Sequence, residues 1–350
     1  MKTSIVLPLI VMLYMATVSL ISGLFGSNPA SDIKIYDFMV ANWRPFDEAF
    51  LSSYGQYPIF MPLLLKFFSM TGLFYYEYGV NIFLCIYTFV AVFLFKDKIR
   101  DIQSLYFLVL MIPPAAIWAQ DEVLSLPLLL YLSMAKNKIN KELIVVSVIG
   151  ILVFKVFFIF YLYSYILNSI IEKKWSKFLI LLGLLVIVTS VTLYGISIAG
   201  YSPRNDFTFG ISSILTKLEI VGYEIQNKVG LSIFLCLTGL LTIKTLWRGR
   251  KIHAAKLSFV LTALFLVTNS HVNPEYFVFL IIPSIAMGLN PVVVSLVYIM
   301  GWFQNGINFI YRTTSMDWLL LLDVTVCLVG GLLTILLVLM NIGKTDEALP

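Results

Sequence analysis

Long, nearly uninterrupted apolar runs constrain this chain more than any other feature of its sequence. Residues 5–25 and 178–199 are two of these runs, and neither holds a charged side chain. About 20 consecutive apolar residues cross the hydrocarbon core of a bilayer as an α-helix, which also satisfies its own backbone hydrogen bonds in lipid. The runs therefore predict an all-α, polytopic integral membrane protein.

The composition excludes several other classes. The 350 residues are 60% hydrophobic and 12% charged, whereas soluble domains are about 45–50% apolar and about 25% charged. A soluble domain or a disordered chain is therefore excluded. The net charge of +5 is small and scattered, so we expect no nucleic-acid partner.

The basic residues between the apolar runs predict the topology. Most Lys and Arg residues fall in four groups, at 96–100, 136–141, 173–177 and 244–256. Cytoplasmic loops carry an excess of Lys and Arg, so we place these groups and both termini in the cytoplasm. In the group at 244–256 we expect His253 to be solvated.

An even number of crossings must separate consecutive cytoplasmic groups, which leads to about twelve transmembrane helices. The predicted spans are 4–25, 78–95, 102–118, 122–135, 142–154, 156–171, 178–199, 229–246, 257–269, 275–289, 291–310 and 318–340. Several form short hairpins. A helix of about 15 residues rises about 22 Å, less than the roughly 30 Å core, so the hairpin tips should face a hydrated cavity.

Two outer loops complete the predicted single transmembrane domain, residues 1–350. The first, residues 26–77, contains a short apolar stretch at 58–73 that we expect to lie along the membrane surface as a helix. The second, residues 200–228, holds several charged residues, Lys217 among them.

Candidate functional residues all fall on the predicted outer side. In the first loop, Asp32 could act as a general base or be a solvated loop charge, and Tyr36, Asp37 and Tyr57 follow it. The later candidates are Asp121 and Glu122 at one hairpin tip, His271, Glu275 and Tyr276 in a late loop, and the cations Arg204 and Arg312.

Lys155 is the most isolated charge. No other charged residue lies within a dozen positions on either side. A lone Lys in an apolar run must snorkel, pair or bind an anion. Two interpretations stay open: Lys155 binds a lipid phosphate or pyrophosphate, or it pairs with Asp121 or Glu122.

The order of these elements resembles the C-type glycosyltransferase (GT-C) superfamily. It is most similar to the catalytic subunit of GPI mannosyltransferase I and its prokaryotic relatives. The likeness covers most of residues 1–170 and about 265–290. The matching elements, in order, are Asp32 to Tyr36, Tyr54-Gly55-Gln56-Tyr57-Pro58, Pro113-Pro114 through Gln120-Asp121-Glu122, Lys155, and Glu275-Tyr276-Phe277.

The first loop departs from the family pattern at one position. Many members have Asp-x-Asp there, but this chain has Asp32-Ile33-Lys34. Asp37 stands at a different spacing. We therefore assign no cofactor and no metal ligand, since the motif does not support a divalent metal.

The resemblance implies inverting transfer of a sugar, such as mannose, from a polyprenyl or dolichyl phosphate to an acceptor hydroxyl of a glycan or glycolipid. Asp32 would be the base, and Lys155 would bind the donor phosphate with help from Arg204, His271 or Arg312. Substrate contacts would come from Tyr36, Asp37, Tyr57, Asp121, Glu122, Glu275 and Tyr276.

The implied setting is the plasma membrane of a prokaryote or the endoplasmic reticulum of a eukaryote. The active site would face outward or the lumen, and the partners would be membrane lipid and a small accessory membrane subunit. Three alternatives stay open: a flippase or transporter of lipid-linked saccharide, a surface-polysaccharide polymerase, and an inactive GT-C scaffold. We find no internal repeat, which a transporter would favour.

Overall fold

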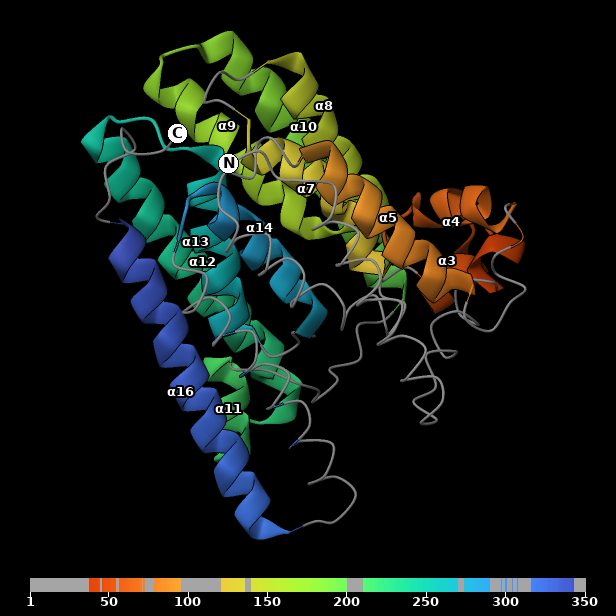
Figure 1. Ribbon diagram of the computed structural model, residues 1–350. Helices are drawn as coiled ribbons and strands as arrows, with labels where there is room; N and C mark the ends of the chain where they lie inside the picture. The colour runs from red at the N-terminus through yellow and green to blue at the C-terminus, as the bar shows by residue number, and fades with distance from the viewer. Residues whose placement is uncertain are drawn as a thin grey trace. The chain divides into compact units, whose positions relative to one another are not determined.

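The computed structural model contains only helices as regular structure in its described part (Figure 1). The predicted all-α class is therefore confirmed for these residues. The described residues are 38–44, 46–54, 57–70, 72, 79–95, 121–135, 140–199, 210–269, 274–289, 297, 300, 304, 307 and 316–342.

Three helices are long and apolar enough to cross a membrane. They are α10 (Trp175–Ala199), α12 (Tyr223–Arg248) and α16 (Asp317–Ile342). At 1.5 Å per residue, about 25 residues rise roughly 37 Å, enough for a core of about 30 Å. The membrane character is supported, and the count of about twelve crossings stays a prediction.

The remaining helices follow the predicted segments, except that Glu48–Tyr54 and Ile211–Lys217 fall inside the two predicted outer loops, at positions where no helix was expected. They are α3 (Glu48–Tyr54), α4 (Met61–Ser69), α5 (Gly79–Phe95), η2 (Asp121–Ser125), α7 (Leu126–Ser133), α8 (Lys141–Ile149), η3 (Gly150–Phe154), η4 (Val156–Phe158), α9 (Ile159–Ile171), α11 (Ile211–Lys217), α13 (Ala254–Thr268), η5 (Pro274–Phe277) and α14 (Val278–Ala286). Several are much shorter than a full crossing, as the predicted hairpins require.

The chain divides into two compact units. The first comprises Met1–Tyr163 with Leu179–Tyr201, and the second comprises Ser164–Phe178 with Ser202–Pro350. The prediction of a single transmembrane domain stays a prediction.

In the first unit, α7 packs against α5 and α8, and η2 packs against η3, around aromatic and aliphatic side chains. Leu126, Phe158 and Tyr161 are fully buried there. The hydroxyl groups of Ser133 and Tyr161 share a hydrogen bond, and Tyr87 donates one to the carbonyl of Leu124 at 2.8 Å. These bonds matter because a buried hydroxyl without a partner is destabilising.

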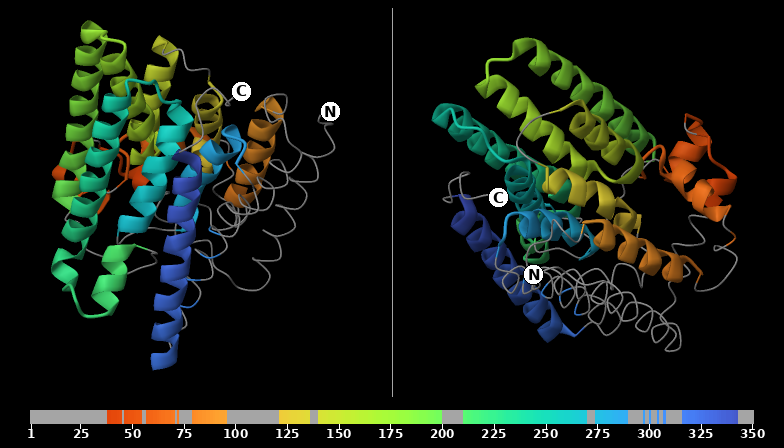
Figure 2. Two further views of the ribbon diagram at one scale, coloured as in Figure 1. Left: turned by 90° about the vertical axis from the view of Figure 1, so that its left-hand side faces the viewer. Right: turned by 45° about the horizontal axis from the view of Figure 1, so that its top comes forward.

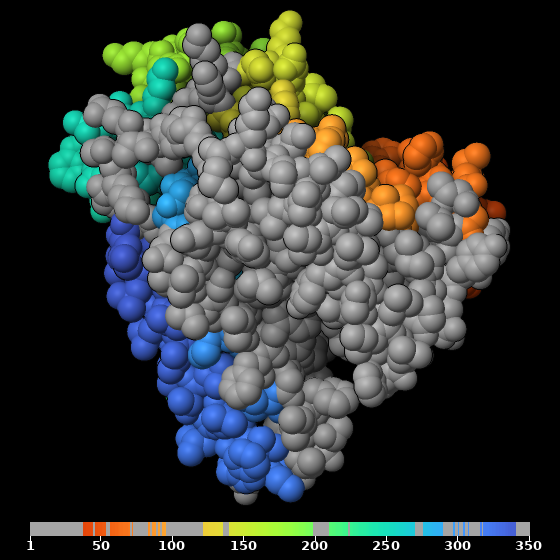
Figure 3. All heavy atoms as spheres, viewed as in Figure 1, coloured from red at the N-terminus to blue at the C-terminus, as the bar shows by residue number. Residues whose placement is uncertain are grey.

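In the second unit, α13 is surrounded by α12, α14 and α16 (Figures 1 and 2). Helix α13 is buried on almost every side, as expected of a helix that is apolar all round. Helix α16 instead lies at the surface seen in Figure 3, and its exposed side chains include Leu332, Leu336 and Leu339. Lipid-facing helices of a membrane protein have this character.

Close backbone packing fixes the start of α11 in the second unit. A Cβ at Gly210 would lie 1.7 Å from the carbonyl oxygen of Asn269, and one at Gly230 would lie 2.5 Å from that of Thr268. The Ser212 hydroxyl donates to the Thr268 carbonyl at 2.8 Å. Only glycine allows this approach, so α11 is anchored at the end of α13.

Two expectations about loops were wrong. His253 is buried, not solvated, because its Nδ1 accepts a hydrogen bond from the backbone N–H of Ala255 at 3.3 Å and caps α13. The second loop is also shorter than predicted: α12 begins at Tyr223, not at residue 229, and includes the buried Gln226. Polar residues that find buried positions extend the helix beyond its apolar run.

Candidate functional site

The site in the first unit is built on a helix that breaks at Lys155. Helix α8 runs into the π-helix η3, and Lys155 follows in an extended conformation (φ −154, ψ 154) before η4 begins. The Phe158 ring lies where a side chain on Gly150 would be, 2.3 Å from an ideal Cβ. Glycine thus lets the chain fold back tightly. The predicted interruption at Lys155 is confirmed.

Lys155 forms an ion pair with Glu122. The Lys155 Nζ lies 2.9 Å from Glu122 Oε1, and the two side chains are 16% and 1% exposed. Glu122 belongs to η2, which leads directly into α7. Of the two acids considered as partners for Lys155, the structure therefore shows Glu122 in contact with it.

This ion pair is not fully satisfied. The second carboxylate oxygen, Glu122 Oε2, is buried and has no hydrogen-bond partner among the residues that the structure describes. A buried, charged acceptor left unpaired is destabilising by about 1–3 kcal/mol or more. Such an atom is poised to accept a hydrogen bond from a donor that enters the site.

Tyr57 brings the first outer loop to the same pair. The Lys155 Nζ lies 5.9 Å from the centroid of the Tyr57 ring, within range of a cation–π interaction. Two hydrogen bonds hold the segment after Tyr57: Phe60 N–H to the Leu152 carbonyl, and the Trp43 indole to the Ile59 carbonyl, both 3.1 Å. The loop is therefore docked on the π-helix.

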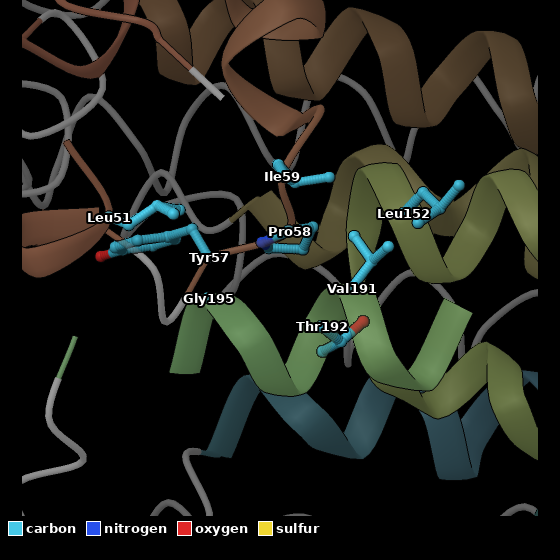
Figure 4. Close-up of a pocket in the computed structure, with 8 residues that line it drawn as sticks. All are labelled: Leu51, Tyr57, Pro58, Ile59, Leu152, Val191, Thr192 and Gly195. Carbon is cyan, nitrogen blue, oxygen red and sulfur yellow. The ribbon is translucent and has the colours of Figure 1, made fainter. Parts of the chain in front are cut away.

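A hollow of about 290 Å³, open space included, adjoins Tyr57 (Figure 4). Figure 4 shows Leu51 and Tyr57 at one end, with Val191 and Thr192 entering from α10. The lining residues are Leu51, Tyr57, Pro58, Ile59, Leu152, Val191, Thr192 and Gly195. The space in it that water-sized groups can occupy is about 20 Å³, far below the roughly 300–1,000 Å³ of ligand pockets, so this mainly apolar hollow holds a small group only.

The helix predicted to lie along the membrane is present as α4. One of its faces exposes Leu63 and Phe67, the latter by 67%, and Met70 just after the helix is 82% exposed, while Met61 and Leu65 are buried. At about 1.5 Å per residue, nine residues rise about 14 Å, too short to cross. An exposed apolar face on a short helix is typical of a helix in the membrane interface.

The structure brings together Tyr57, Glu122 and Lys155 among the predicted site residues. Tyr276 lies half-buried in η5, in the second unit. Asp121 is the first residue of η2, and Glu275 lies within η5, but the side chains of both are outside the described part. The candidates that lie wholly outside the described residues are Asp32, Tyr36, Asp37, Arg204, His271 and Arg312.

Sequence reasoning missed a second buried ion pair, in the second unit. Lys217 pairs with Asp323 Oδ2, and Gln304 Nε2 donates to Asp323 Oδ1 at 3.0 Å. The two charged side chains are 13% and 1% exposed, whereas the sequence pattern placed Lys217 only among the charged residues of the second loop. The available signal was Asp323 itself, the sole charge within residues 318–340, because charges inside apolar helices are rare and need partners.

Within the described ranges, no three His, Cys, Asp or Glu side chains gather closely enough to hold a metal ion. No protein-family model, curated protein or solved structure matches this chain. Any conclusion about activity therefore depends on the residues and the geometry themselves.

Proposed function

We propose that this protein is a membrane glycosyltransferase of the GT-C type, with about twelve crossings. It would transfer a sugar, such as mannose, from a polyprenyl-phosphate donor to an acceptor hydroxyl, with inversion, on the outer or lumenal face. The observation that carries the proposal is the Lys155–Glu122 pair beside Tyr57, at a broken helix and next to an apolar hollow.

The cation at this position suits the leaving group of the reaction. A departing lipid phosphate develops negative charge, which a nearby ammonium stabilises. Lys155 is 16% exposed and so retains access on one side, while Glu122 holds it in place. The second oxygen of Glu122 is buried without a hydrogen-bond partner in the described residues, and it would accept a hydrogen bond from a sugar or acceptor hydroxyl.

The chemistry also needs a base on the opposite face of the sugar. In an inverting transfer, the acceptor oxygen attacks the anomeric carbon as the bond from that carbon to the phosphate oxygen breaks. Asp32 takes the proton of the acceptor hydroxyl, and the polyprenyl phosphate leaves toward Lys155. Because phosphate is a good leaving group, the mechanism needs no strong general acid.

The test is a transfer assay with membranes that contain the full chain and radiolabelled polyprenyl-phosphate-mannose. We expect Asp32→Asn to abolish transfer while expression is unchanged. Asp47→Asn is the matched control, because Asp47 is a first-loop carboxylate with its side chain 37% exposed, paired with Arg44. Full transfer by Asp32→Asn would remove Asp32 as the base.

A flippase of lipid-linked saccharide is the second candidate function. The interrupted helix at Lys155 and the charge of Asp323 inside α16 favour it, since transporters use broken helices and buried charges at their binding sites. The same assay separates the two functions. A transferase releases labelled product with a new glycosidic bond, whereas a flippase moves the intact donor across the bilayer.

A further inference from the structure

Two loops of the second unit carry exposed Lys and Arg residues that the proposed reaction does not use. The segment between α9 and α10 contributes two of them, and the end of α12 with the residues after it contributes four. We call these six exposed residues the cationic surface: Lys173, Lys174, Lys244, Arg248, Arg250 and Lys251.

Specific hydrogen bonds join the two loops. The Asn168 side chain donates to the Ile252 carbonyl at 2.9 Å and accepts from the Ile252 N–H at 3.0 Å. The carboxylate of Glu172 binds Lys174 at 2.7 Å and also binds Lys251. The six cations therefore belong to one connected surface.

The charge of this surface is strongly unbalanced. Glu172 is the sole acid within residues 172–177 and 244–256. Six cations and one carboxylate leave an excess of five positive charges. An excess of this size attracts anionic groups, most strongly at low salt.

Two tryptophans place the surface at the depth of lipid headgroups. Trp247 is 89% exposed and Trp175 is 60% exposed. Trp175 begins one candidate membrane span, and Arg248, next to Trp247, ends another. Exposed Trp side chains concentrate at membrane–water interfaces, so the neighbouring cations lie where phospholipid phosphates are.

We propose that the cationic surface binds the headgroups of anionic phospholipids, on the side of the membrane where α10 begins and α12 ends. Arg248 and Arg250 supply planar guanidinium groups that can donate paired hydrogen bonds to a phosphate. Clusters of Lys and Arg next to a membrane helix bind anionic lipid in this way. The proposal is independent of glycosyl transfer.

The test measures lipid selectivity of the full chain in phosphatidylcholine vesicles. Trace spin-labelled phosphatidylglycerol or spin-labelled phosphatidylcholine is added, and electron paramagnetic resonance gives the motionally restricted fraction of each. We expect phosphatidylglycerol to associate about five-fold more strongly or better at low salt, and this preference to fall as salt is raised.

The variants locate the effect. The double variant Arg248→Gln/Arg250→Gln should lose most of the preference. Lys228→Gln should keep it, because Lys228 is an exposed cation near the other end of the same helix, α12. Circular dichroism checks that both variants retain their helix content.

Four results would overturn the proposal: no preference in the wild-type protein, a preference insensitive to salt, a preference retained by the double variant, or an equal loss in Lys228→Gln. The first two need only the wild-type chain, so the proposal stays falsifiable even if the double variant fails to fold.

Discussion

Each unit of the protein holds a buried lysine–carboxylate pair. The two pairs differ in how many of their carboxylate oxygens have a hydrogen-bond or ionic partner. In the second unit, Asp323 uses both oxygens, one toward Lys217 and one toward Gln304, from within the uninterrupted helix α16. In the first unit, Glu122 uses one oxygen for Lys155, beside a broken helix, and its other oxygen is buried with no partner in the described part of the chain.

The difference fits a structural role for one pair and the proposed functional role for the other. A fully paired buried ion pair can hold two helices together, although it contributes little net stability compared with an apolar pair. A pair with an unsatisfied oxygen, next to an aromatic ring and a hollow, keeps a capacity to bind that packing alone does not require. We therefore interpret Lys217–Asp323 as structural and Lys155–Glu122 as the functional pair.

The largest expected effect is on stability, from Asp323→Asn. The change leaves the buried ammonium of Lys217 without a counter-charge, so we expect the free energy of unfolding to fall by about 3–5 kcal/mol. Denaturant unfolding in detergent micelles measures it. Thr325→Ala, at an exposed position of the same helix, should change stability by less than about 0.5 kcal/mol.

Further variants sharpen the contrast between the pairs. Replacing both partners by apolar residues, Lys217→Met/Asp323→Leu, should restore most of the stability lost in Asp323→Asn. Glu122→Gln should lower stability less than Asp323→Asn does, because one Glu122 oxygen already lacks a partner among the described residues. An equal loss in Glu122→Gln and Asp323→Asn would remove the distinction.

The second prediction concerns transfer activity. Lys155→Met removes the cation proposed to stabilise the leaving phosphate, and we expect transfer to fall about 10²–10³-fold. The control is Lys66→Met, which removes an exposed cation of α4 and should leave the rate unchanged. If transfer in Lys155→Met stays within a factor of two of wild type, Lys155 has no role in the reaction.

The third prediction tests the packing behind the structural pair. Gly210→Ala forces a Cβ onto the backbone of Asn269, so we expect a loss of about 1–3 kcal/mol as α11 shifts. At Gly239, in α12, no atom lies within 4 Å of an added Cβ, and Gly239→Ala should be neutral or stabilising because alanine favours helix. The same unfolding assay compares them, and similar losses at both sites would contradict the packing argument.

The smallest expected effect comes from Glu172, whose side chain is 16% exposed and pairs with two lysines that are more exposed. Its hydrogen bonds to Lys174 and then Lys251 lower the pKa of the Glu172 carboxyl below its ordinary value. The pKa of the Glu172 carboxyl is thus lower in the folded protein than in the unfolded chain. Its stabilising effect is complete at pH values above the unfolded-state pKa, and it is lost as the pH falls through the folded-state pKa. Because the lysines are more than half exposed, we expect less than about 1 kcal/mol.

The measurement for Glu172 is unfolding as a function of pH in the acid range. Glu172→Gln should reduce the fall in the free energy of unfolding at acid pH. Glu219→Gln, at an exposed carboxylate of the second unit, should leave that fall unchanged. A Glu172→Gln profile that overlays the wild-type one would show that the pair contributes nothing measurable.

The helices themselves were predictable from local sequence. The apolar runs at 178–199 and 318–340 correspond to α10 and α16, and the lone Lys155 marks the break between two short helices. Run length and an interrupting charge are local properties, and a helix satisfies its own backbone wherever it lies. The positions of helices and of their interruptions can therefore be determined without knowing which segments pack against them.

The sequence alone determined that this is a helical, membrane-type chain with sparse charges that must find partners. Only the tertiary structure decided the partners. Adjacent residues of a helix diverge widely around its axis, so at most one of Asp121 and Glu122 can readily face a given lysine, and Lys217 meets Asp323 across more than a hundred positions. A buried charge is satisfied by whatever group helix packing brings near it, and that depends on contacts between segments that no local pattern encodes.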